Sequence, residues 1–236
     1  MSIWTRLSEI VSRLSATAFS QVVEGVRTLF AGDPELRRQV SFSVAMIALS
    51  AKMAKADGVV TQDEIQAFRE IFSIPPEEER NVARLYNLAK RDIAGFEAYA
   101  EKMAGLCGSG SSNCMMLEDI LDGLFHIAKA DGVIHERELG YLQRVAEIFE
   151  IDQAHFASIV ARHAILGERD PYAVLGVLPG TPYGEIRKRY RSLVSENHPD
   201  KAIARGMPTE FIAIANRRMA AINDAFSSIE RSLKPA

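Results

Sequence analysis

Residues 182–200 read PYGEIRKRYRSLVSENHPD, and this stretch decides how the C-terminal part of the chain folds. At 100° per residue, four side chains fall on one stripe of a helix spanning 182–197: Ile186, Tyr190, Leu193 and Asn197. The residue before a proline is disfavoured in the helical region, so His198 is expected to end this helix. Pro199 fixes its own φ angle. The stretch therefore predicts a helix ending in a rigid turn that displays His198 and Asp200.

A second amphipathic helix is predicted to begin near Pro208, after a loop. Its apolar stripe contains Ile212, Ala215, Met219, Ile222, Phe226 and Ile229. Two helices with facing apolar stripes form an antiparallel hairpin. Three cations of the first helix lie off its stripe: Arg187, Lys188 and Arg191. A run of charged residues usually forms only a solvated helix face. The position of these three cations just before His198 nevertheless favours a binding surface.

Four motifs of this region, in order, resemble the J domain of DnaJ-type proteins. They are Tyr172–Val177, Glu185–Leu193, His198–Lys201, and the set Ile222, Asn223, Ala225 and Phe226. The resemblance implies that the basic helix and the turn dock on a DnaK-type chaperone and stimulate its ATP hydrolysis. It assigns electrostatic contact to Arg187, Lys188 and Arg191, and the trigger to His198, Pro199 and Asp200.

Two residues depart from the J-domain pattern. Asn197 stands where an aromatic residue is common, and Met219 stands where phenylalanine is usual. Both are interpreted as packing changes that leave the trigger intact. The long insert Ala202–Pro208 resembles the variant found in the DjlA group of J proteins.

The middle of the chain is predicted to be an all-helical bundle with an internal repeat. Helices are expected at about 34–56, 62–73, 76–90, 92–106, 114–130, 136–149 and 153–165. The stretch KADGVV at 55–60 recurs as KADGVI at 129–134, which indicates two related helical hairpins. The repeat resembles the TerB-like domain over roughly residues 35–165. A TerB-like domain followed by a J domain is the arrangement of the DjlA group.

Each repeat carries two acidic residues at a spacing that occurs in calcium-binding loops: Asp57 with Glu64, and Asp131 with Glu138. Two further positions that should be acidic in the first copy are Met53 and Lys55, so a loop with about six oxygen ligands cannot form. Turn formation and helix capping, with Thr61 and Glu64 as a capping box, are the favoured interpretation. An acidic ligand site at the four carboxylates is the weaker alternative, and no metal site is predicted.

Charge and composition limit the class of protein. The chain has 236 residues and a net charge of −3; residues 33–166 carry 21 acidic and 14 basic side chains, whereas residues 167–236 carry 8 and 11. The small basic surplus of residues 167–236 does not indicate binding to nucleic acid. No apolar stretch is long enough to span a membrane and no signal peptide is seen, so a cytoplasmic location is expected.

Cys107 and Cys114 are expected to be reduced thiols, with a loop disulfide as the lesser alternative.

The sequence therefore predicts an all-α, non-enzymatic co-chaperone without a cofactor. Its expected parts are an N-terminal amphipathic helix (1–32), a TerB-like bundle (33–166) that selects an unknown client or partner, and a J domain (170–236). The N-terminal helix is expected to pack on the bundle or on a second protomer, which leaves a homodimer open, with peripheral membrane contact as the lesser option. The alternative function is a metal- or oxyanion-binding stress-response protein in which the TerB-like part dominates.

Overall fold

The computed structural model describes residues 3–13, 22, 25, 32–57, 62–92, 95–105, 114–164 and 170–233. Helices are the regular elements throughout these ranges, which contain no strand, so the predicted all-α fold is confirmed. The first group of helices, here called the bundle, is α1 (Ile3–Arg13), α3 (Pro34–Asp57), α4 (Gln62–Phe72), α5 (Glu79–Arg91), α6 (Phe96–Ala104), α7 (Met115–Ala128), α8 (Glu136–Ile148) and α9 (Gln153–His163). The second group, the C-terminal hairpin, is α10 (Pro171–Leu175), α11 (Tyr183–Glu196), α12 (Pro199–Ala204), η2 (Thr209–Phe211) and α13 (Ile212–Leu233).

Helix α3 is the central element of the bundle. Every residue from 40 to 54 is buried, because α1, α5, α6, α7 and α8 all pack around it. A helix that is apolar on all sides is stable only when it is enclosed in this way. Its buried serines keep their hydroxyls within the helix, as Ser50 does by donating to the Met46 carbonyl at 2.6 Å.

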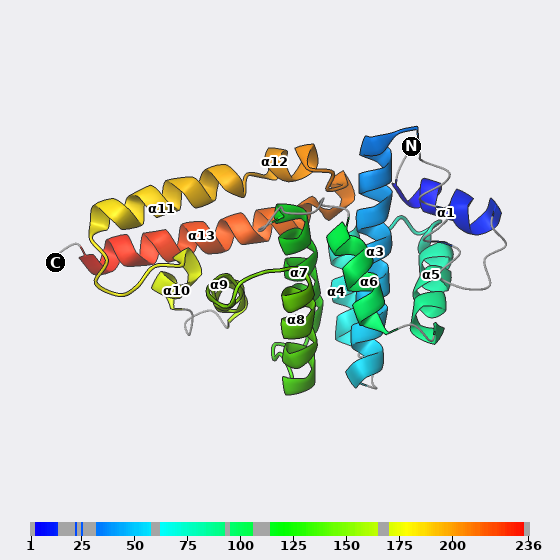
Figure 1. Cartoon of the computed structure of the whole chain (residues 1–236), viewed down its shortest axis with the longest axis horizontal. Coiled ribbons are helices and arrows are strands. Elements are labelled where there is room, and N and C mark those ends of the chain that lie inside the picture. The colour runs from blue at the N-terminus through cyan, green and yellow to red at the C-terminus, as the bar shows by residue number, and fades with distance from the viewer. Residues whose placement is uncertain are drawn as a thin grey trace.

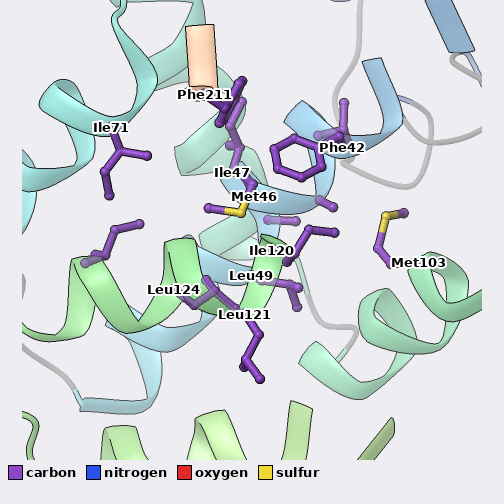
Figure 2. Close-up of a cluster of buried hydrophobic side chains, with 14 of the residues drawn as sticks. Phe42, Met46, Ile47, Leu49, Ile71, Met103, Ile120, Leu121, Leu124 and Phe211 are labelled. Atoms are coloured by element: carbon purple, nitrogen blue, oxygen red, sulfur yellow. The ribbon is translucent and has the colours of Figure 1, made fainter. Parts of the chain in front are cut away.

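Helix α7 lies against α3 and supplies much of the remaining core. Figure 2 shows Ile120, Leu121 and Leu124 of α7 close to Met46 and Leu49 of α3. Such enclosed aliphatic side chains each contribute about 1.5–3 kcal/mol to folding. The close approach of the two helices fixes the position of α7 and of the side chains on its other faces.

The N-terminal helix α1 packs on the bundle, as predicted for the amphipathic segment 1–32, of which the structure describes only residues 3–13, 22, 25 and 32. Ile3, Trp4 and Leu7 belong to the main apolar core, and the backbone N–H of Ile3 donates to Glu210 of the C-terminal hairpin at 3.1 Å. Among the described residues, no helix combines the length and the apolar character needed to cross a bilayer. Peripheral membrane contact and a homodimer remain predictions.

The C-terminal hairpin has a small apolar core of its own. Figure 1 shows α11 and α13 running antiparallel with α10 beside them. The buried residues of this second core are Val174, Leu175, Ile186, Leu193, Ile222, Ala225, Phe226 and Ile229. Ile186, Tyr190 and Leu193 of the first predicted stripe therefore pack with Ile222, Phe226 and Ile229 of the second, whereas Ile212 and Ala215 of the second stripe pack with the main core. The hairpin also joins the main core, through Ala202, Met207, Phe211, Ile214 and Ala215.

Two local predictions are wrong. The segment after His198, expected to be a loop, begins helix α12 at Pro199, because proline suits the first turn of a helix and His198 caps it. Cys114, expected to be a reduced thiol, is disulfide-bonded; residue type and spacing alone do not determine whether a thiol is oxidised. The other cysteine of the chain, Cys107, lies outside the described residues.

Candidate functional site

The turn after α11 holds His198 in a defined and exposed position. His198 has extended backbone angles, and its Nδ1 accepts a hydrogen bond from the backbone N–H of Asp200 at 3.2 Å. Side-chain exposure is 54% for His198 and 87% for Asp200, so both can reach a partner. The Nδ1 atom also lies 3.5 Å from the Asp200 carboxylate. Since Nδ1 is committed to the cap, Nε2 is the ring nitrogen that is available to a second protein.

The three predicted cations lie on α11, which ends immediately before this turn. Arg187, Lys188 and Arg191 are all exposed. Arg187 and Arg191 are one helical turn apart, and Arg187 precedes His198 by a rise of about 16 Å along the helix. The structure therefore places the three cations on α11, and His198, Pro199 and Asp200 directly after it, where α12 begins.

Neighbouring polar and aromatic residues fix the orientation of α11. The ring of Tyr190 stacks on Phe226 of α13 with 4.0 Å between centroids, and its hydroxyl donates to Asn223 at 3.0 Å. A fourth cation of the same run, Arg189, donates from Nε to the Leu175 carbonyl of α10 at 3.2 Å. These contacts keep the face that carries Arg187 turned towards solvent.

Three buried carboxylates lie on α7 and were not predicted as functional. This acidic trio, Glu118, Asp119 and Asp122, is almost completely enclosed between the bundle and the hairpin. Its partners come from α9, α13 and the end of α12. Arg162 Nη2 lies 2.7 Å from Glu118 Oε1, and His163 Nε2 lies 2.8 Å from Asp122 Oδ1. The signal that could have revealed the trio was three acids in a helix whose other residues are mostly apolar.

The arginines around the trio hold two of its members as carboxylates. Burial by itself raises the pKa of Glu118, but the guanidinium groups of Arg218 and Arg162 outweigh burial and hold that pKa below the usual range. Burial also raises the pKa of Asp122, but the guanidinium groups of Arg162 and Arg218 outweigh burial and hold that pKa well below its usual range. Burial dominates at Asp119 and raises its pKa despite Arg218 and Arg205.

Arg218 of α13 connects the acidic trio to the turn. Its Nη2 atom lies 2.8 Å from Asp119 Oδ1 as an ion pair, and its Nε atom donates to Asp122. Its Nη1 atom donates at 3.0 Å to Oδ1 of Asn197, the residue that precedes His198. The interpretation of Asn197 as a packing change is therefore incomplete, because this side chain also carries a hydrogen bond to a buried charge.

The carboxylates predicted as an acidic ligand site are partly engaged in turn chemistry. Asp131 accepts from the backbone N–H of Val133 at 3.0 Å, and the buried Glu138 accepts from the backbone N–H of His135 at 2.9 Å. The hydrogen bond from Val133 is the main reason why the pKa of Asp131 is lowered. The side chains of Asp57 and Glu64 lie outside the described part of the structure. Within that part, no three His, Cys, Asp or Glu side chains form a group that could hold a metal ion.

A cavity of about 530 Å³ lies where the bundle meets α13. Its lining includes His126 and Lys129 of α7 and its C-terminal turn, His163 of α9, and Arg217 of α13. Burial, and then the nearby charge of Arg217, lower the pKa of His126 to about 4. His163 contacts Asp122 of the acidic trio, and His126 lines the same cavity as Asp122.

Comparison with known proteins gives two family matches. The family described as "Tellurite resistance protein TerB" matches residues 43–161, and the DnaJ domain family matches residues 170–230. The chain is 27% identical over 223 residues to the Co-chaperone protein DjlA of Photobacterium profundum, which covers 82% of this chain and 78% of the relative. It is 25% identical over 239 residues to the protein of that name from Vibrio cholerae, with coverage of 86% and 82%. No solved structure matches the chain significantly.

The two matched regions follow each other in the order predicted from the repeat and the turn. The TerB match spans half of the chain and covers the bundle from α3 to α9, while the DnaJ match covers α10 to α13. The chain therefore belongs to the TerB family, as a J-domain protein of the DjlA type.

Proposed function

We propose that the chain is a co-chaperone whose J domain binds a DnaK-type chaperone and stimulates its ATP hydrolysis. The observation that carries this proposal is the exposed turn of His198, Pro199 and Asp200 at the end of a basic helix. The name of the relatives, Co-chaperone protein DjlA, supports the same role.

The roles of the site residues differ in kind. Arg187, Lys188 and Arg191 attract an acidic surface of the partner and orient it during encounter, which mainly affects the association rate. The trigger is the turn itself. His198 Nε2 and the Asp200 carboxylate make the contacts that change the state of the ATPase, and Pro199 holds the backbone between them.

The TerB-like domain selects the client or partner to which the chaperone is recruited. It has an acidic surplus of charge, opposite to that of the J domain, which suits two different partners.

Single-turnover ATP hydrolysis by a bacterial DnaK-type chaperone, with the full chain added, tests the proposal. The wild-type chain should accelerate hydrolysis, and His198→Gln should abolish the acceleration while leaving the chain folded, with only a small decrease in melting temperature from the lost cap of α12. A matched control is His135→Gln, because His135 has a similar exposure of 56% but lies at the start of α8 in the bundle. Absence of stimulation by a folded wild-type chain, or equal stimulation by His198→Gln, contradicts the proposal.

The alternative is binding of a metal or oxyanion by the TerB-like domain. For a metal ion, it predicts that calcium or zinc raises the melting temperature of the full chain, and that Asp131→Asn combined with Glu138→Gln removes the increase. The hydrogen bonds that already occupy Asp131 and Glu138 favour the co-chaperone proposal.

A further inference from the structure

The side chain of Asn197 links the trigger turn, through Arg218 of α13, to the buried carboxylates of the TerB-like domain. Its Oδ1 atom accepts from Arg218 at 3.0 Å, and its Nδ2 atom donates to the Leu193 carbonyl at 2.8 Å. Asn197 is buried and is the C-terminal cap of α11. Because it directly precedes His198, the orientation of its backbone sets the direction in which the turn leaves the helix.

A second contact holds the other end of α12. Arg205 follows that helix, and its Nη1 atom donates to the Glu196 carbonyl at 3.1 Å, which bridges the turn from one side to the other. Its Nη2 atom lies 3.5 Å from Asp119 Oδ2. Asp119 thus contacts both Arg205 and Arg218, so one carboxylate of the TerB-like domain is linked to the turn on both sides.

These links persist because breaking them would leave charge buried without compensation. The side chain of Arg218 is only 1% exposed, and it lies within ion-pair distance of all three members of the acidic trio. Removing one member of such a buried set is strongly destabilising. The apolar residues that follow, Met207 and Phe211, are enclosed in the main core and restrict the same segment further.

We propose that Asn197 and Arg205 are positioning residues, through which the acidic trio of the TerB-like domain holds His198 and Asp200 in the geometry that triggers the ATPase. This inference rests on the proposed co-chaperone function and assigns to the TerB-like domain a part in the trigger itself. Neither residue needs to touch the chaperone. Their effect is to keep the turn in one conformation before the partner arrives.

The test uses full chains carrying Asn197→Ala or Arg205→Ala. The second variant alters a partly exposed side chain, so it remains informative if the first folds poorly. The matched controls are Asn87→Ala and Arg84→Ala, an exposed asparagine and an exposed arginine on α5 of the bundle. Three quantities are measured: the melting temperature, amide hydrogen exchange of the segment 196–206, and single-turnover stimulation as a function of co-chaperone concentration.

We expect both variants to stay folded at the assay temperature and to exchange faster in 196–206 than the wild-type chain. Maximal stimulation should fall roughly tenfold, since small misplacements of a working group have large effects on rate. The half-saturating concentration should change little, because the basic face of α11 is intact. Neither control should change exchange in this segment or stimulation.

Other results overturn the inference. Wild-type exchange and stimulation in both variants would leave the co-chaperone function standing and remove the positioning role. A loss of stimulation that merely follows global unfolding, or a change in half-saturating concentration alone, would also contradict it. If the wild-type chain gives no stimulation, the proposed function fails, whereas hydrogen exchange still decides whether Asn197 and Arg205 hold the turn.

Discussion

The ring of Trp4 lies 5.7 Å from the ring of Phe211, centroid to centroid, although the two residues stand near opposite ends of the chain. Both rings are fully enclosed, and each also contacts Phe72 of α4. The first helix and the segment that leads into the last one therefore share a single aromatic cluster.

Trp4→Ala should lower the free energy of unfolding by about 3–5 kcal/mol, the usual range for deleting a large buried aromatic side chain. Trp4→Phe should have a smaller effect, because the buried indole N–H has no hydrogen-bond partner to lose. Urea denaturation followed by circular dichroism measures both. Similar stabilities for the alanine variant and the wild type would show that α1 does not contribute to the core.

Gly206→Ala should destabilise the chain by about 2 kcal/mol, within the range expected for strained backbone. Gly206 has a φ of +104°, and an added Cβ would lie 2.9 Å from Cβ of Arg38 on α3. Gly180→Ala is the matched control, because its φ is +87° but an added Cβ meets nothing within 4 Å. The melting temperature should be clearly lower for Gly206→Ala than for Gly180→Ala. The reverse order would show that the close approach of Gly206 to α3 is not a constraint.

Arg162→Met should cost about 3 kcal/mol of stability, since Glu118 and Asp122 would lose a buried counter-charge. The matched control is Arg144→Met, which removes an exposed ion pair of similar length, 2.8 Å to Glu147, and should have no measurable effect. Chemical denaturation of both variants at neutral pH makes the comparison. Equal losses in the two would mean that the acidic trio does not need Arg162.

Stability should fall as the pH decreases from about 6.5, the ordinary pKa of histidine, to about 4. The pKa of His126 is lowered to about 4, and burial also lowers the pKa of His163. The unfolded chain therefore takes up protons in this window before the folded chain does, which favours unfolding. His126→Gln should flatten the dependence of melting temperature on pH. An unaltered pH profile for His126→Gln would contradict the assignment.

Arg187→Ala should raise the half-saturating concentration for stimulation of the chaperone without lowering the maximum. The difference from the wild-type chain should be largest at low salt, because attraction between exposed charges is screened over about 8 Å at physiological ionic strength. Titrations at several salt concentrations measure this, with Arg84→Ala as a control on the bundle surface. A loss of maximal stimulation that is independent of salt would instead assign Arg187 to the trigger.

Local patterns were sufficient for much of the fold. The apolar period of residues 34–56 predicted α3, which the structure bounds at Pro34–Asp57, and the proline after His198 predicted where α11 ends. The match of the repeat and of the four J-domain motifs then determined the family. These features depend on residues that are close in sequence, where spacing alone carries the information.

The contacts around the acidic trio could not be predicted in the same way. Arg218 and Asp122 are 96 positions apart, and nothing in the sequence around either residue identifies the other as its partner. Asn197 was interpreted as a packing change for the same reason, because its hydrogen bond to Arg218 depends on how α13 is placed against the end of α11. Helix α12 was missed because a proline was read as the end of one helix and not also as the start of the next.

The main apolar core extends across the junction between the two family regions, since Met207, Phe211 and Ile214 of the J region are enclosed by the TerB helices. The TerB region and the DnaJ region therefore share one apolar core in this protein, although they belong to different families. A J region transplanted from this chain into another protein would expose the apolar residues that the TerB helices cover here. Chimaeras that exchange J regions between relatives should keep their function only when the recipient supplies a surface shaped like α3, α4 and α7.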